Sequence, residues 1–124
     1  MNIEEIRDYC IAKPGVTEGF PFDQVTLVFK VMNKIFAISS LERIPPAISL
    51  KCDPERAIEL RATYEEVQPG YHLNKQQWNT INPSGRIPEE LLRELIDHSY
   101  DLIVKGLKRA DQEALKKLGS SITS

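Results

Sequence analysis

The stretch that decides the fold runs from Val25 to Ser39 and reads VTLVFKVMNKIFAIS. Up to Val31 its side chains alternate with a period of two, which is the pattern of a β-strand. Asn33-Lys34 then predicts a tight turn, because Asn tolerates a positive φ. With that two-residue loop, Val31 faces Phe36 across the two strands. The sequence therefore predicts a β-hairpin.

The predicted hairpin has one apolar face and one mixed face. The apolar face collects Val25, Leu27, Phe29, Val31, Phe36 and Ile38. The mixed face collects Thr26, Val28, Lys30, Ala37 and Ser39. The register set by the turn and the binary pattern agree, as expected of a true hairpin.

Further elements are expected on both sides of the hairpin. Upstream, Asn2 and Glu5 have the spacing of a capping box, and the helix they open should end before Pro14. Downstream, the chain predicts a third strand, a helix opened by Asp53-Pro54, two short strands, a long helix opened by Pro88 and a short last helix that Gly119 ends. These three strands cover residues 47–52, 66–73 and 78–82.

The predicted order is α-β(3)-α-β(2)-α with a short extra C-terminal helix. Helices that interrupt a mainly antiparallel sheet must cover one of its faces. The fold class is therefore α+β, a two-layer sandwich with five strands and helices on one face. The open face of the sheet should display Lys30, Ser39, Ser49 and Lys51.

Length and composition point to a soluble globular protein. The 124 residues fit one domain, which we assign to 1–118, with 119–124 as a flexible tail. Hydrophobic residues at 41% and charged residues at 27% are ordinary globular values. No apolar run approaches the ~20 residues that span a bilayer, and no signal peptide is recognisable. Two cysteines without a CxxC spacing fit a reducing compartment, so we expect a cytoplasmic protein without membrane contact.

Several motifs resemble those of the MmcQ/YjbR family. They are Glu18-Gly19-Phe20-Pro21-Phe22, Lys34-Ile35-Phe36-Ala37, the junction at Leu50-Lys51-Cys52-Asp53-Pro54, and above all Pro69-Gly70-Tyr71-His72-Leu73-Asn74-Lys75 followed by Trp78-Asn79-Thr80. The resemblance extends over roughly 3–107, nearly the whole chain. It implies a secretion-chaperone-like, CyaY-like α+β fold, which matches the order of elements above. It also implies double-wing DNA binding.

The 69–80 motif supplies candidate nucleic-acid contacts. Lys75 would pair with phosphate, Asn74 and His72 would hydrogen-bond, and Trp78 or Tyr71 would stack on an unpaired base. In the alternative, Trp78 and Tyr71 belong to the core, and Asn74 and His72 hold the loop by backbone hydrogen bonds.

Basic side chains outside this motif add to the candidate interface. Lys30, Lys34 and Lys51 would form a stripe across the open sheet face, although lysines also serve to keep such a face soluble. Arg43 and Arg86 would extend the stripe from loops. Net charge is −2, but the segment 30–87 is mildly basic.

No catalytic residue, metal site or cofactor is expected. Cys52 and His72 form the one conceivable thiol–imidazole pair, and Cys52 alternates inward, which predicts an inert core thiol. His98 is expected on the surface and lacks metal-ligand spacing with His72 or either cysteine. We therefore expect a non-catalytic protein that binds DNA, single- or double-stranded and sequence-tolerant. A protein- or peptide-binding adaptor is the alternative.

Overall fold

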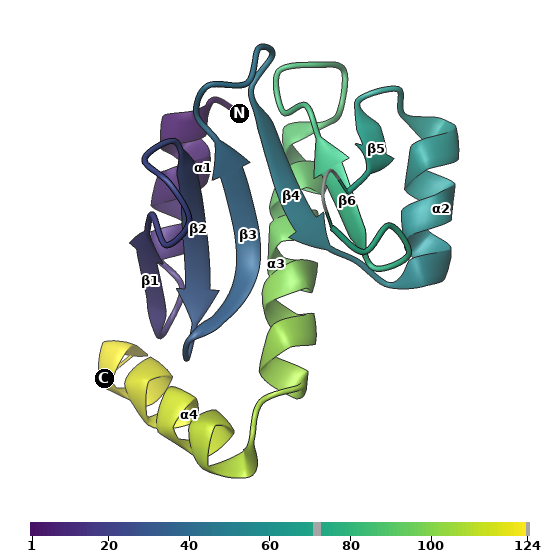
Figure 1. Cartoon of the computed structure of the whole chain (residues 1–124). Helices are drawn as coiled ribbons and strands as arrows, with labels where there is room; N and C mark the ends of the chain where they lie inside the picture. The colour runs from purple at the N-terminus through teal and green to yellow at the C-terminus, as the bar shows by residue number, and fades with distance from the viewer. Residues whose placement is uncertain (71–72, 124) are drawn as a thin grey trace.

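The computed structural model describes residues 1–70 and 73–123 and has the α+β fold (Figure 1). Its elements are α1 (Ile3–Ile11), β1 (Val16–Gly19), β2 (Thr26–Val31), β3 (Lys34–Ser40), β4 (Ala47–Lys51), α2 (Pro54–Thr63), β5 (Val67–Pro69), β6 (Trp78–Ile81), α3 (Glu89–Lys105) and α4 (Arg109–Thr123). Within the described residues, six strands form one antiparallel sheet in the order β1-β2-β3-β4-β6-β5. The α+β class is confirmed, with six strands where five were expected.

Three helices cover one face of this sheet. α3 lies across β2, β3 and β4, α1 packs against β1, and α2 packs against β5 and β6 (Figure 1). Their apolar side chains meet those of the strands in one core, which includes Ile6, Phe29, Phe36, Ile48, Leu50, Ile81, Leu92 and Ile96. α4 lies at the end of the sheet below β1 and β2, and its Leu115 joins the same core.

Helix starts follow the predicted local chemistry. The Asn2 side chain accepts from the Glu5 N–H at 2.8 Å, and the Glu5 carboxylate accepts from the Asn2 N–H at 3.2 Å, so the capping box is confirmed. Asp53 caps α2 by accepting from the Arg56 N–H, with Pro54 in the first turn. These signals act within four residues, which is why sequence alone identifies them.

The hairpin forms, but its predicted register is wrong. Met32 and Asn33 are the turn residues, with φ of 48° and 69°, so Val31 pairs with Lys34. A β-bulge follows, in which Phe36 is the extra residue and Phe29 pairs with Ala37. As a result Ile38 lies on the outer face, whereas Ala37 and Ser39 face the helices, the reverse of the expectation. The binary pattern cannot locate the bulge, because the four residues at 35–38 are all apolar.

Two further elements differ from the prediction. β1 is absent from the predicted order because its four residues are too few to show a period. It is held by pairing with β2 and by Glu18, which accepts from Arg7 of α1 at 2.8 Å. α4 continues to Thr123, past the expected stop at Gly119. Glycine costs a helix about 1 kcal/mol, which does not always end it.

Candidate nucleic-acid interface

The candidate interface lies on the face of the sheet opposite α1, α2 and α3. Cross-strand partners arrange its side chains in rows that run across the strands. One row comprises Val28, Ile38, Ser49 and Thr80. The next row toward the β2–β3 turn comprises two cross-strand pairs, Lys30 with Ile35 and Lys51 with Trp78. We call this second row the lysine row.

Loops turn the middle of this face into a trough of about 750 Å³. Its lining is mostly apolar or hydroxyl-bearing, with one acidic and one basic residue: Phe22, Asp23, Thr26, Ile35, Ile38, Ser40, Arg43, Ala47, Ser49, Leu73 and Thr80. On the floor, the hydroxyls of Ser49 and Thr80 share a hydrogen bond of 2.8 Å. Asp23 accepts from the N–H groups of Val25 and Thr26, and these bonds lower the pKa of its carboxyl group. The trough is therefore a largely neutral cavity.

The lysine row borders the trough. Lys30, Lys51 and Trp78 are each half-buried, so part of every side chain is accessible. Lys30 also lines a smaller hollow of about 350 Å³ together with Thr17, Val28 and Asn33. Trp78 lies outside the buried core, and the alternative placement in the core is wrong for this residue.

Ser99 of α3 positions Lys51 from the other side of the sheet. Pairing between β3 and β4 ends at Ala37 and Leu50, and beyond that point the two strands diverge (Figure 1). The Ser99 hydroxyl bridges the two strands where the next backbone hydrogen bond between β3 and β4 would otherwise form. It donates to the Phe36 carbonyl oxygen at 2.6 Å and accepts from the Lys51 N–H at 2.9 Å.

At the β5–β6 connection, the side chains of Lys75 and Asn74 form hydrogen bonds with backbone groups of the loop itself. Lys75 donates from Nζ to the Gly70 carbonyl oxygen at 3.1 Å, and Asn74 accepts from the Gln76 N–H at 2.9 Å. The Asn74 carbonyl oxygen accepts from the Trp78 N–H, which fixes the start of β6. Both side chains thus help to hold the loop that presents Trp78. The two other candidates of this motif, Tyr71 and His72, lie outside the described residues.

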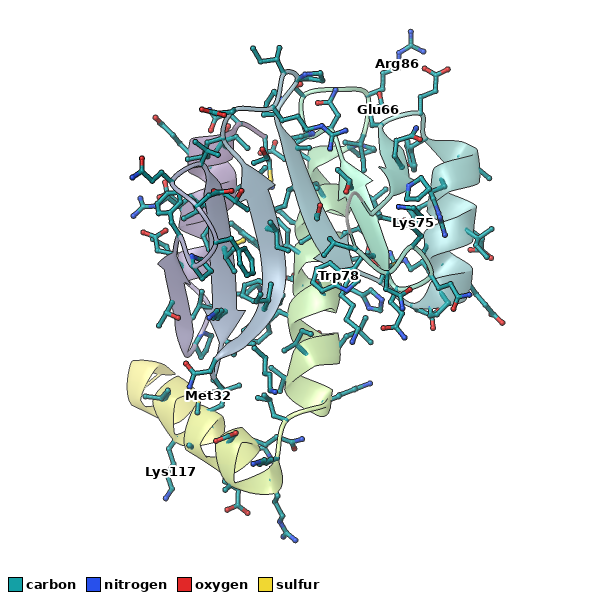
Figure 2. All side chains as sticks on the ribbon, viewed as in Figure 1. Met32, Glu66, Lys75, Trp78, Arg86 and Lys117 are labelled. Atoms are coloured by element: carbon teal, nitrogen blue, oxygen red, sulfur yellow. The ribbon has the colours of Figure 1, made fainter. Side chains whose placement is uncertain are left out.

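The two remaining basic candidates lie away from the lysine row. Lys34 begins β3 and is exposed, but it pairs with the buried, helix-facing Val31, so the expectation that it belongs to the open sheet face is wrong. Arg86 lies beyond the other end of β6, where its N–H donates to Glu66 at 2.6 Å and lowers the pKa of that carboxyl group. Figure 2 shows Arg86 beside Glu66 at the top of the view and Trp78 well below them. The structure thus places Lys30, Lys51 and Trp78 on the outer face and leaves Lys34 and Arg86 apart from them.

The two cysteines lie in the core, and His98 lies at the start of α2. Cys52 is buried as predicted, and burial raises the pKa of its thiol; burial raises the pKa of the Cys10 thiol to about 12. His98 is half-buried rather than exposed, because its Nε2 accepts from the Asp53 N–H at 3.1 Å at the start of α2. Among the described residues, no group of three or more His, Cys, Asp and Glu side chains could hold a metal ion.

His98 makes the stability of the fold sensitive to pH. Burial lowers its pKa from the ordinary 6.5, and the nearby Arg56 acts in the same direction. Below about pH 6.5 the unfolded chain therefore binds this proton more readily than the folded protein, and the free energy of unfolding should fall as the pH drops toward the folded pKa. Urea unfolding of wild type and His98→Gln at about pH 7.5 and pH 5.5 measures this, since glutamine keeps an acceptor but does not titrate. An equal pH slope in both proteins would contradict the assignment.

The fold and site define a class of protein: an antiparallel sheet covered by helices on one face, with a trough and a lysine row on the other. A family model described as YjbR matches residues 11–102. The chain belongs to the YjbR family. No described helix has the length and apolar character needed to cross a membrane.

Full-length relatives and solved structures support this membership. Escherichia coli O157:H7 YbdF is 38% identical over 91% of this chain and 93% of its own length. YjbR of Escherichia coli K12 is 36% identical over 95% of this chain and 100% of its own length. A crystal structure of a Deinococcus radiodurans protein with a domain described as DUF419 is 41% identical, with a TM-score of 0.86 over 93% of this chain and 88% of that one. A crystal structure from Pseudomonas syringae is 26% identical, with a TM-score of 0.72 over 82% and 98% of the two chains.

Sequence reasoning missed most of the trough. Ile38 reaches the outer face only because of the bulge, and Leu73 joins the trough only from the loop before β6. For Phe22, the sequence does contain an indication that the side chain is exposed. An aromatic residue in a segment bounded by Pro21 and Asp23, outside any periodic pattern, is expected to be exposed, and its exposed fraction is 65%.

Proposed function

We propose that this protein binds single-stranded nucleic acid on the outer face of its sheet, without catalysis. The observation that carries the proposal is the lysine row, in which Lys51 lies across from Trp78 and Lys30 lies on the same face two strands away. Lysines supply the phosphate contacts that dominate nucleic-acid affinity, and an accessible tryptophan supplies a sequence-tolerant stacking surface.

The electrostatic surroundings support the same proposal. Within the described residues, Lys30 and Lys51 form no ion pair, so neither charge is directly paired with a carboxylate. The acidic side chains Glu65 and Glu66 line a separate hollow of about 300 Å³ near Arg43 and Pro45. The two ends of the face therefore differ: Lys30 and Lys51 lie toward the β2–β3 turn, whereas the other end carries both signs of charge, with Glu65 and Glu66 beside Arg43 and Arg86.

A single strand fits this face better than a duplex does. Trp78 lies within the sheet surface and not on a protruding loop, so it can reach the face of a base only when that base is unpaired. Sheet surfaces of other folds use aromatic and basic residues in the same way for single-stranded RNA.

One observation favours a second candidate, the protein- or peptide-binding adaptor. Four large apolar side chains, Phe20, Phe22, Leu41 and Ile44, are exposed in the loops before β2 and after β3. The Leu41 N–H donates to the Val25 carbonyl oxygen at 2.8 Å, so the two loops adjoin. Exposed apolar patches of this kind are typical of protein-interaction surfaces.

The salt dependence of binding tests the proposal. If Lys30 and Lys51 each neutralise one phosphate, log affinity for single-stranded DNA should fall with log salt at a slope of about −1.4. Lys51→Ala and Lys30→Ala should each flatten the slope by about 0.7. Arg86→Ala removes the same charge at the far end of the face and should leave the slope unchanged. Fluorescence anisotropy of a labelled oligonucleotide, titrated at several salt concentrations, measures all three.

The contrary results are equally specific. If the folded protein does not bind single-stranded DNA at low salt, nucleic-acid binding fails and the adaptor becomes the better candidate. If Arg86→Ala changes the slope as much as Lys51→Ala does, binding is a diffuse charge effect and not a property of the lysine row.

A further inference from the structure

We propose that the trough accommodates one unstacked base of the bound strand while the lysine row holds the adjoining phosphates. The inference rests on the proposed function and adds the site that would receive the base. It assigns Phe22, Ile38, Ser49 and Thr80, none of which the sequence motifs single out as binding residues.

The trough and the lysine row form one continuous surface. Ile35 lines the trough and is the cross-strand partner of Lys30. Ser49 lines the trough and lies two residues before Lys51 on β4, while Thr80 lies two residues after Trp78 on β6. Two residues along a strand span about 6.5–7 Å. A group bound over Ser49 and Thr80 therefore lies about one such two-residue spacing from Lys51.

The lining suits a heterocyclic base. Phe22, Ile35, Ile38 and Leu73 offer apolar contact to the faces of a flat ring. The Ser49 and Thr80 hydroxyls already share one hydrogen bond and the Thr26 hydroxyl donates to Asp23, so these oxygens would meet the edge of a base chiefly as acceptors, with their remaining lone pairs. The combination of apolar walls and a few polar groups is that of small-molecule sites, and the volume of about 750 Å³ lies within their usual range.

The charge distribution indicates which part of the strand lies in the trough and which part lies outside it. The trough lining carries one carboxylate, Asp23, and one guanidinium, Arg43, whereas the lysine row carries only positive charge. A phosphate placed in the largely apolar trough would lose its hydration without a matching excess of positive charge, which is costly. The base is therefore expected inside the trough and the phosphates outside it, on Lys30 and Lys51.

The experiment compares an intact oligothymidine with a strand of equal length that lacks all bases. Wild type should bind the intact strand about tenfold to a hundredfold more tightly, because base stacking adds to the phosphate contacts. Ile38→Trp fills the trough with an uncharged side chain and should reduce this preference about tenfold, leaving the salt slope unchanged. Ile58→Trp adds the same bulk at an exposed position of α2, on the opposite face of the sheet, and should leave the preference unchanged.

Phe22→Ala provides a second variant whose folding is not at risk, since its side chain is mostly exposed. It should also reduce the preference for bases. If both strands bind with a lysine-dependent salt slope and neither variant alters the preference, the trough proposal fails and the proposed function stands. If neither strand binds, both fail. Two further results would contradict the proposal that the trough holds a base of a bound strand. One is a mononucleotide that binds as tightly as the strand. The other is an uncharged apolar peptide that binds in the trough while neither strand binds.

Discussion

Replacing Ser99 by alanine is expected to lower the free energy of unfolding by about 2–4 kcal/mol. The Ser99 hydroxyl is fully buried and is the hydrogen-bond partner of the Phe36 carbonyl oxygen and the Lys51 N–H, at a point where β3 and β4 no longer pair. Removing the hydroxyl leaves both backbone groups without that partner, and an unsatisfied buried group costs about 1–3 kcal/mol. Urea unfolding followed by circular dichroism measures the change.

Ser84→Ala is the matched control. The Ser84 hydroxyl is exposed and bonds only to Asn82 two residues away, so its loss should change stability by less than about 0.5 kcal/mol. A Ser99→Ala protein as stable as this control would contradict the prediction. It would mean that the Phe36 carbonyl oxygen and the Lys51 N–H find other hydrogen-bond partners, for example each other, when the hydroxyl is absent.

Phe36→Ala should be more costly, at about 3–5 kcal/mol. The ring is fully buried, lies 6.5 Å from the Phe29 ring centroid, and meets the Tyr100 ring edge-on at 5.5 Å. It is also the extra residue of the bulge, so alanine leaves a cavity where the sheet bends onto α3. Calorimetry or urea unfolding gives the value.

Two comparisons make the Phe36 result specific. Phe36→Leu keeps most of the apolar volume and should lose clearly less than Phe36→Ala. Phe20→Ala removes an equally large but half-exposed ring and should lose much less. If Phe36→Ala and Phe20→Ala cost the same, the Phe36 ring does not contribute to the core as its burial indicates.

Much of the fold is predictable because its signals are local. The capping box at Asn2, the Asp53-Pro54 helix start and the alternation along β2 each act within a few residues. Burial of Cys52 follows from the alternation that begins with Ile48 and Leu50 on β4. The helices cover one face because an antiparallel sheet interrupted by helices has few other solutions.

The remaining features depend on contacts distant in sequence. β1 exists because β2 offers a free edge, and the bulge at Phe36 is invisible in a run of four apolar residues. In the site, alternation alone places Lys30 and Lys51 on the outer face. The separation of Arg86 from them depends on where the loop after β6 leads, and the placement of Leu73 over the trough depends on the loop before it. Neither path is encoded in a short motif.

The single extra residue of the bulge, Phe36, decides which of the later sequence positions of β3 face the helices and which face outward. Shortening β3 by one residue at Phe36 would restore uninterrupted alternation and leave Ala37 and Ser39 facing the helices and Ile38 facing outward, because these residues keep their partners on β2. The floor of the trough would then stay the same, while every residue after the deletion would shift by one position in the sequence relative to β2. Relatives should therefore be compared after their hairpins are brought into phase with this bulge. Otherwise residues that face the ligand in one protein are matched with residues that face the core in another.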